Sequence, residues 1–135
     1  MLKVIVCHHF AVTRLPFYLR TLWMQKKVQL SRDRAWELTV THFRHNRADD
    51  ESDAFRYFVW SGILTQLTSA QFAKDYTDAH ESCVTQDLGQ TMDYENNRLG
   101  RVTAQKMKES GDLSEERWCN RHCSCCNKKI NSHQA

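Results

Sequence analysis

Glycine and proline are scarce in this chain of 135 residues, which contains four glycines and one proline. Average proteins contain about 7% glycine and 5% proline. Because β-sandwiches and barrels need many turns, and turns draw on these two residues, the scarcity argues against an all-β fold. It favours long helices joined by short polar connections, and the chain length is that of one ordinary domain.

Long hydrophobic runs are also missing. No apolar segment approaches the roughly 18 to 20 residues that a membrane-spanning helix requires. The first two dozen residues are rich in apolar and aromatic groups, but they are interrupted by charged side chains at Lys3, Arg14 and Arg20. A secretory signal needs an uncharged apolar core and small residues at its cleavage site, so we expect no signal peptide. Localisation stays open: action in the bacterial periplasm would require export by another route or as a passenger.

The chain has little excess charge of either sign. Nineteen Lys and Arg against sixteen Asp and Glu give a net charge of +3. This excess is too small to indicate a nucleic-acid-binding surface, so we expect no specific nucleic-acid partner. Hydrophobic residues make up 41% and charged residues 26%, which is near the globular average and excludes wholesale disorder.

The six cysteines are unevenly distributed. Two stand alone, and the other four crowd near the C-terminus, at Cys119, Cys123, Cys125 and Cys126. Such a cluster could cross-link only the tail to itself, which does not suit a disulfide framework for the whole chain. Structural zinc sites need two separated ligand pairs, and these four crowded cysteines do not provide them. We therefore expect no metal, and we expect no other cofactor. We interpret residues 112–135 as a polar, cysteine-rich tail that follows a single domain over 1–111.

Apolar residues recur at helical spacing along most of the chain, which predicts a compact all-helical domain of about five helices. The pattern predicts helices over 15–29, 34–43, 52–67, 69–81 and 87–110. The clearest of them, over 52–67, has an apolar face formed by Ala54, Phe55, Phe58, Val59, Ile63 and Leu67. The expected caps are Ser31 for the second helix, Asp50 or Ser52 for the third, and Gly111 at the end of the last.

Two of these helices carry polar stripes. Beside the apolar face of the helix over 52–67, the spacing i, i+3, i+4, i+7 aligns Asp53, Arg56, Tyr57 and Trp60. The last predicted helix aligns Asp93, Asn96, Asn97 and Gly100 in the same way. Asn and Asp compete for backbone hydrogen bonds and are poor helix-interior residues, so such a stripe costs stability unless something uses it. The alternative is an ordinary solvated face.

Two further pairs add titratable groups to this set. Glu81 can act as a general acid or base if a partly apolar site raises its pKa, and His80 can do the same or bind a metal. The alternative is a helix end at which His80 interacts with the macrodipole. His45 and Asn46 open a polar connection. We expect three helices to bring these groups to one solvent-reachable cleft, where Arg56 binds a carboxylate or phosphate; a buried ion-pair network is the structural alternative.

Taken in order, these motifs resemble a little-characterised bacterial domain family with the pattern HN, DAFRH and a later W, AHE, and MDxxNNxxG. The matching residues are His45-Asn46, Asp53-Ala54-Phe55-Arg56 with Trp60, Ala79-His80-Glu81, Met92-Asp93, Asn96-Asn97 and Gly100. The resemblance covers about 44–101, and Tyr57 stands where the family more often has histidine. It implies an all-helical fold and a shared polar site. Such domains often end large exported or toxin-like proteins, which implies an effector.

The leading hypothesis is a small antibacterial effector or lysis-type hydrolase that acts on the bacterial cell envelope. In its most concrete form it cleaves peptidoglycan glycan strands, with Glu81 as general acid, Asp93 as second carboxylate and His80 as a further catalytic candidate. The residues expected to bind or orient substrate are His45, Asp53, Arg56, Trp60, Asn96 and Asn97. The expected partners are the cell-wall polymer and an immunity or inhibitor protein.

Two other classes stay open. A divalent metal held by His45, His80, Asp53 and Asp93 would suit a phosphodiesterase acting on phospholipid or nucleic acid. A non-catalytic binding module would instead keep the polar stripes as a buried network and dock a partner through its aromatic N-terminus. The amphipathic, basic segment Leu15 to Lys27 also suits peripheral membrane contact, although core packing is the commoner use of such a face.

Overall fold

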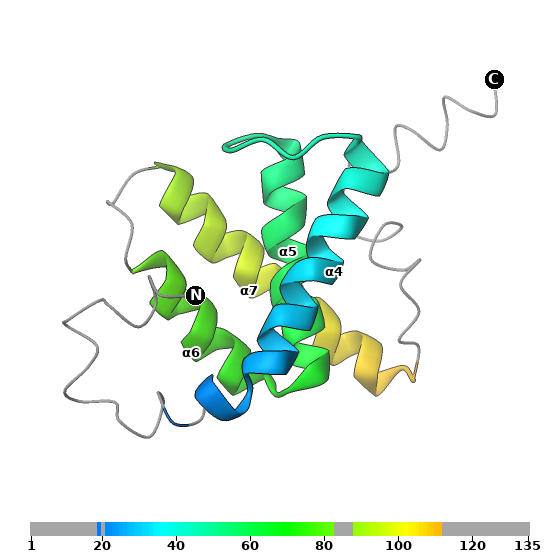
Figure 1. The fold of residues 1–135 in the computed structure, drawn as a ribbon. Coiled ribbons are helices and arrows are strands. Elements are labelled where there is room, and N and C mark those ends of the chain that lie inside the picture. The colour runs from blue at the N-terminus through cyan, green and yellow to red at the C-terminus, as the bar shows by residue number, and fades with distance from the viewer. Residues whose placement is uncertain (1–18, 20, 83–87, 112–135) are drawn as a thin grey trace.

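The computed structural model describes residues 19, 21–82 and 88–111, and these residues form helices and no strand. Four helices follow one another: α4 (Gln25–Phe43), α5 (Glu51–Leu67), α6 (Ala70–Glu81) and α7 (Leu88–Glu109) (Figure 1). The all-helical class predicted from the sequence is confirmed. Within the described ranges no helix is long and apolar enough to cross a membrane. The predicted tail over 112–135 and all six cysteines lie outside these ranges.

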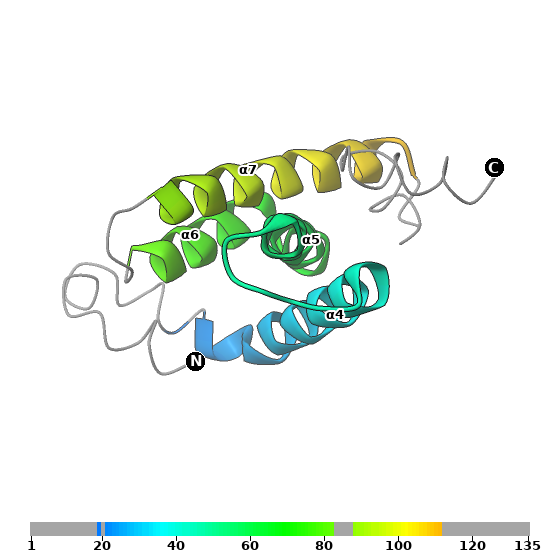
Figure 2. The same ribbon diagram turned by 90° about the horizontal axis from the view of Figure 1, so that it is seen from above.

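Helix α5 is the centre of the bundle. It packs against α4 on one side and against α6 and α7 on the other, as Figure 2 shows. Its side chains are buried without interruption from Tyr57 to Thr65. The apolar face predicted for this helix was therefore too narrow, and two of its members, Ala54 and Leu67, are only half-buried. Because other helices surround α5, it is buried on more than one face.

Local capping signals set the helix ends. The Asp50 side chain accepts hydrogen bonds from the backbone N–H groups of Ser52 at 2.8 Å and Asp53 at 3.1 Å. Ser69 caps α6 by accepting from the N–H of Phe72 at 3.1 Å. Gly111 follows α7 with φ +70°, a left-handed conformation that glycine adopts without strain. The caps expected at Asp50 and Gly111 are thus confirmed.

The cap expected at Ser31 is wrong. Ser31 is fully buried inside α4, and its Oγ donates to the carbonyl oxygen of Val28 at 2.8 Å. A hydroxyl that bonds back to the preceding turn needs no partner outside its own helix, so a small serine is tolerated on the buried face. The helix predicted over 34–43 therefore begins earlier, and one continuous α4 includes the C-terminal part of the helix predicted over 15–29.

A close crossing of α5 and α7 positions the polar residues of both helices. A Cβ atom added at Gly100 would lie 2.0 Å from the carbonyl oxygen of Phe58, so only glycine permits this approach. Three residues away, the Ser61 Oγ donates to the carbonyl oxygen of Asn97 at 2.8 Å. These contacts hold the middle of α7 against the middle of α5.

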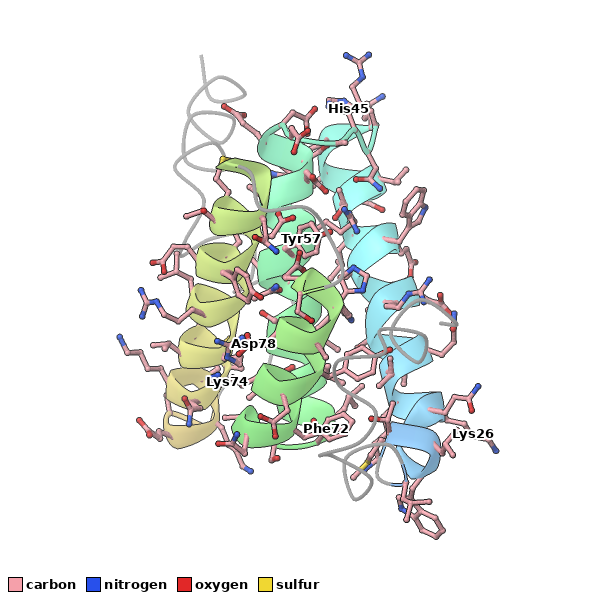
Figure 3. All side chains as sticks on the ribbon, turned by 90° about the vertical axis from the view of Figure 1, so that its left-hand side faces the viewer. Lys26, His45, Tyr57, Phe72, Lys74 and Asp78 are labelled. Atoms are coloured by element: carbon pink, nitrogen blue, oxygen red, sulfur yellow. The ribbon has the colours of Figure 1, made fainter. Side chains whose placement is uncertain are left out.

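Helix α6 is the shortest of the four, with 12 residues against 17 to 22 in the others. It ends at Glu81 and stops short of the first turns of α5, while α4 and α7 continue beside them (Figure 3). Tyr57 lies near this end of α6 (Figure 3). The C-terminal end of α6 therefore meets the polar stripe of α5, and the functional candidates gather there.

Candidate functional site

Glu81 is the centre of a polar cluster formed by α5, α6 and α7. Its side chain is only 1% exposed, and the Asn97 Nδ2 of α7 donates to its Oε1 at 3.3 Å. Burial raises the pKa of Glu81 to about 8, and the negative charge of Asp93 contributes to the rise. The hydrogen bond from Asn97 and the charge of Arg56 act in the opposite direction and are outweighed. Glu81 is thus predominantly protonated at neutral pH.

An ion pair on α5 forms the next part of the cluster. The Arg56 guanidinium bonds to Oδ1 of Asp53, and Oδ2 of Asp53 accepts from the backbone N–H of Asp49 at 2.9 Å. Burial opposes the charge on Arg56, but its hydrogen bond to Asp53 and the charge of that carboxylate prevail, so the pKa of Arg56 is raised. The Asp53 side chain is 9% exposed, whereas the Arg56 side chain is 28% exposed. The pair therefore reaches from the interior to the surface.

Aromatic rings connect the ion pair to the end of α6. The Arg56 guanidinium carbon lies 4.5 Å from the centre of the Tyr57 ring, a cation–π contact. The ring of His80 lies 5.2 Å from Trp60 and 6.4 Å from Tyr57, measured between centroids. Burial raises the pKa of Tyr57 to about 12, and the charges of Glu81 and Asp93 add to this effect. Tyr57 is therefore a neutral hydroxyl within the cluster.

Three buried polar atoms in this region have no hydrogen-bond partner in the described structure. They are Nε of Arg56, Nε1 of Trp60 and Oδ1 of Asn97. Buried polar atoms are normally paired, and each exception calls for an explanation. A bound molecule could satisfy these two donors and one acceptor, of which the Asn97 side chain also bonds to the Glu81 carboxyl.

The structure thus brings together most of the residues predicted for the site. Asp53, Arg56 and Asp93 all act electrostatically on Glu81, Asn97 bonds to Glu81, and His80 contacts the rings of Trp60 and Tyr57. Asn96 is half-buried on α7, next to Asn97. Tyr57, which was placed on the stripe but not among the candidate site residues, belongs to the cluster. Its proximity to Glu81 depends on how α5 and α6 pack, which stripe spacing alone does not show.

His45 lies apart from this group. Its Nε2 is 3.2 Å from Oδ2 of Asp50, beside the N-terminal cap of α5, and its ring packs edge-on against Phe43. Nothing in the described contacts links His45 to Glu81. Hydrogen bonds, those from Ser52 foremost, hold the pKa of Asp50 below its usual value, and the contact with His45 adds to them. The structure therefore places His45 with the start of α5.

No three His, Cys, Asp or Glu side chains among residues 19, 21–82 and 88–111 are grouped so as to hold a metal ion. The four residues considered for a metal, His45, His80, Asp53 and Asp93, are therefore not such a group. The described cluster offers proton-transfer and hydrogen-bonding groups around a carboxyl whose pKa is raised.

The fold and the cluster define an all-helical domain with a buried, protonated carboxyl at the junction of three helices. The chain belongs to the family described as Domain of unknown function (DUF6973), whose model matches residues 16–132. The match extends well beyond the segment 44–101 that carries the motifs, so α4, the residues just before it and most of the cysteine-rich segment also belong to the family. Neither a curated protein nor a solved structure matches the chain.

Proposed function

We propose that this protein is a hydrolase of the bacterial cell envelope that uses Glu81 as its general acid, and that its substrate is the glycan strand of peptidoglycan. The observation that carries the proposal is the environment of Glu81, which is buried, faces the negative charge of Asp93 and has a pKa raised to about 8. A general acid must hold its proton at the working pH, and burial with a like charge nearby is how enzymes achieve this.

The chemistry would use two carboxyl groups in different states. Glu81 donates its proton to the glycosidic oxygen as the bond from that oxygen to the sugar carbon breaks. Asp93 stabilises the positive charge that develops on the sugar ring, or orients the water that attacks it. Water attacks the sugar carbon and forms the new C–O bond, and the proton that this water releases returns to the ionised carboxyl of Glu81. Asp93 is half-buried, which would allow substrate to approach from its side.

The unpaired atoms around Glu81 support a ligand with many polar groups. Nε of Arg56 and Nε1 of Trp60 can donate, and Oδ1 of Asn97 can accept. Sugars with hydroxyl and acetamido groups offer both acceptors and donors. The exported, toxin-like setting of the proteins that the motifs resemble also supports an envelope target.

The experiment compares the wild-type chain with Glu81→Gln on purified bacterial cell walls. Glutamine keeps the shape of the side chain but carries no transferable acidic proton, so release of reducing sugar ends is expected to fall by about a hundredfold or more. The matched control is Glu95→Gln, because Glu95 is an exposed glutamate on α7 that pairs with Arg98. Full activity in Glu81→Gln would show that Glu81 is not the general acid. An inactive wild-type chain would show that peptidoglycan is not the substrate.

Expression in two compartments identifies the target. We expect lysis when the chain is directed to the bacterial periplasm and none when it stays in the cytoplasm. Killing from the cytoplasm alone would instead favour a nucleic-acid target.

A second candidate is a non-catalytic binding module, and it is favoured by the depth of Glu81. The 1% exposure of this side chain and its bond to Asn97 also suit a network that fixes how α6 meets α7. In that case Glu81→Gln would change stability, and the wild-type chain would have no turnover to lose.

A further inference from the structure

Large apolar side chains are exposed in the first turns of α4 and in the residues just before it. Trp23 is 86% exposed, and Leu19, Leu22 and Leu30 are each more than half exposed. Leu22 lies just before α4, whereas Lys26 and Leu30 lie one turn apart within it, and all three line a groove. We call this surface the α4 patch, formed by Leu19, Leu22, Trp23, Lys26, Lys27 and Leu30. The core packing expected of such a face is absent for these residues, and the patch is free to meet a partner.

The α4 patch is basic. Lys26 and Lys27 are exposed, and in the described ranges neither is paired with a carboxylate; Figure 3 shows Lys26 on the outer surface of α4. The one acidic residue at the groove is Asp33, whose Oδ1 accepts from Nε2 of Gln29 at 2.7 Å.

The sequence around the α4 patch also carries an excess of positive charge. Asp33 is the first acidic residue of the chain, and the segment before it carries Lys3, Arg14, Arg20, Lys26, Lys27 and Arg32. From Asp33 onward, acidic residues outnumber Lys and Arg. A charge asymmetry of this kind is typical of a segment that approaches an anionic surface.

The apolar side chains of the α4 patch indicate whether its anionic partner is a nucleic acid or a lipid membrane. Contacts to nucleic-acid phosphates use cationic and polar groups, and three leucines with an exposed tryptophan add nothing to them. In a lipid interface, tryptophan and leucine enter the region below the headgroups while lysine extends its charge to the phosphates. We propose that the α4 patch docks the protein on the surface of a membrane that contains anionic lipid. This proposal does not depend on the hydrolase activity.

The test uses the full chain and two kinds of vesicle, one of pure phosphatidylcholine and one of phosphatidylcholine mixed with phosphatidylglycerol. We expect co-sedimentation with the mixed vesicles and little with the neutral ones. Lys26→Gln and Lys27→Gln should each weaken binding by about fivefold, since a lysine near an anionic surface contributes about 1 kcal/mol. Trp23→Ala should weaken it by about tenfold, through the apolar area that no longer enters the interface.

Trp36 provides the matched control. It is an exposed tryptophan, at 55%, that lies within α4 but outside the α4 patch, so Trp36→Ala should bind vesicles like the wild-type chain. Equal binding to both vesicle types, binding to neither, or equal loss in Trp36→Ala and Trp23→Ala would each overturn the proposal. Two other outcomes would overturn the proposal if the wild-type chain does not bind vesicles. In the first, the wild-type chain forms a dimer in light scattering that Trp23→Ala abolishes. In the second, the wild-type chain binds an oligonucleotide and Trp23→Ala does not.

Discussion

Replacing Glu81 with glutamine is expected to stabilise the fold at alkaline pH while leaving its stability at acidic pH nearly unchanged. The pKa of Glu81 is about 8 in the folded protein, against an ordinary value of 4.5. Between these two values the folded chain holds one more proton than the unfolded chain. The free energy of unfolding therefore falls as the pH rises through this window, and the contribution of Glu81 is fully present only below its lower end.

The magnitude follows from the size of the shift. At about 1.4 kcal/mol for each pKa unit, the loss across the whole window has an upper limit of about 5 kcal/mol. Relaxation of the buried site around a charged Glu81 reduces this loss to about 2 to 4 kcal/mol. Glutamine is neutral at every pH and can still accept the hydrogen bond from Asn97, so the variant should escape the loss.

Urea denaturation followed by far-UV circular dichroism, at about pH 5 and about pH 8, measures both free energies of unfolding. The wild-type chain should lose stability between the two conditions, and Glu81→Gln should lose much less. Glu95→Gln is the control, because Arg98 lowers the pKa of this exposed glutamate, and its replacement should bring no gain at the higher pH. Parallel pH profiles for the wild-type chain and Glu81→Gln would refute the reasoning, because they would mean that Glu81 titrates as an ordinary carboxyl.

Three further predictions concern the fold and the cluster. Asp50→Ala removes the N-terminal cap of α5 and should lower the midpoint of urea denaturation; an unchanged midpoint would contradict this role. Gly100→Ala places a Cβ atom 2.0 Å from the Phe58 carbonyl oxygen, so about 2 to 3 kcal/mol should be lost in thermal unfolding, and a stabilised variant would contradict the close crossing. Asp93→Asn removes a charge that raises the pKa of Glu81, so the loss of unfolding free energy between about pH 5 and about pH 8 should become smaller than in the wild-type chain; an unchanged loss would contradict the interaction between the two groups.

Much of the fold could be predicted because the signals are local. A cap such as Asp50 or Ser69 acts on N–H groups within three residues of itself, so its effect can be read from neighbouring letters. Ser31 shows where this reasoning fails. A serine suits a helix start as well as a buried position at which it bonds to the preceding turn, and only the packing of α4 distinguishes the two.

The residues that the structure gathers around Glu81 could be predicted only in part. The stripes on α5 and α7 indicated Asp53, Arg56 and Asn97, because helical spacing alone puts residues on one face. His45 was grouped with them on the order of motifs, yet the structure places it beside Asp50. Tyr57 was left out, although the packing of α5 against α6 and α7 brings it within electrostatic reach of Glu81.

The sequence by itself determined the helical class, the principal caps and the residue types available for proton transfer, because each depends on neighbours a few positions apart. Only the tertiary structure decided that Glu81 is buried, that Asp93 of another helix acts on it, and that Trp23 faces outward. Burial and the distance between charges on different helices depend on how those helices pack. The raised pKa of Glu81 and the exposure of the α4 patch are therefore properties of the assembled bundle.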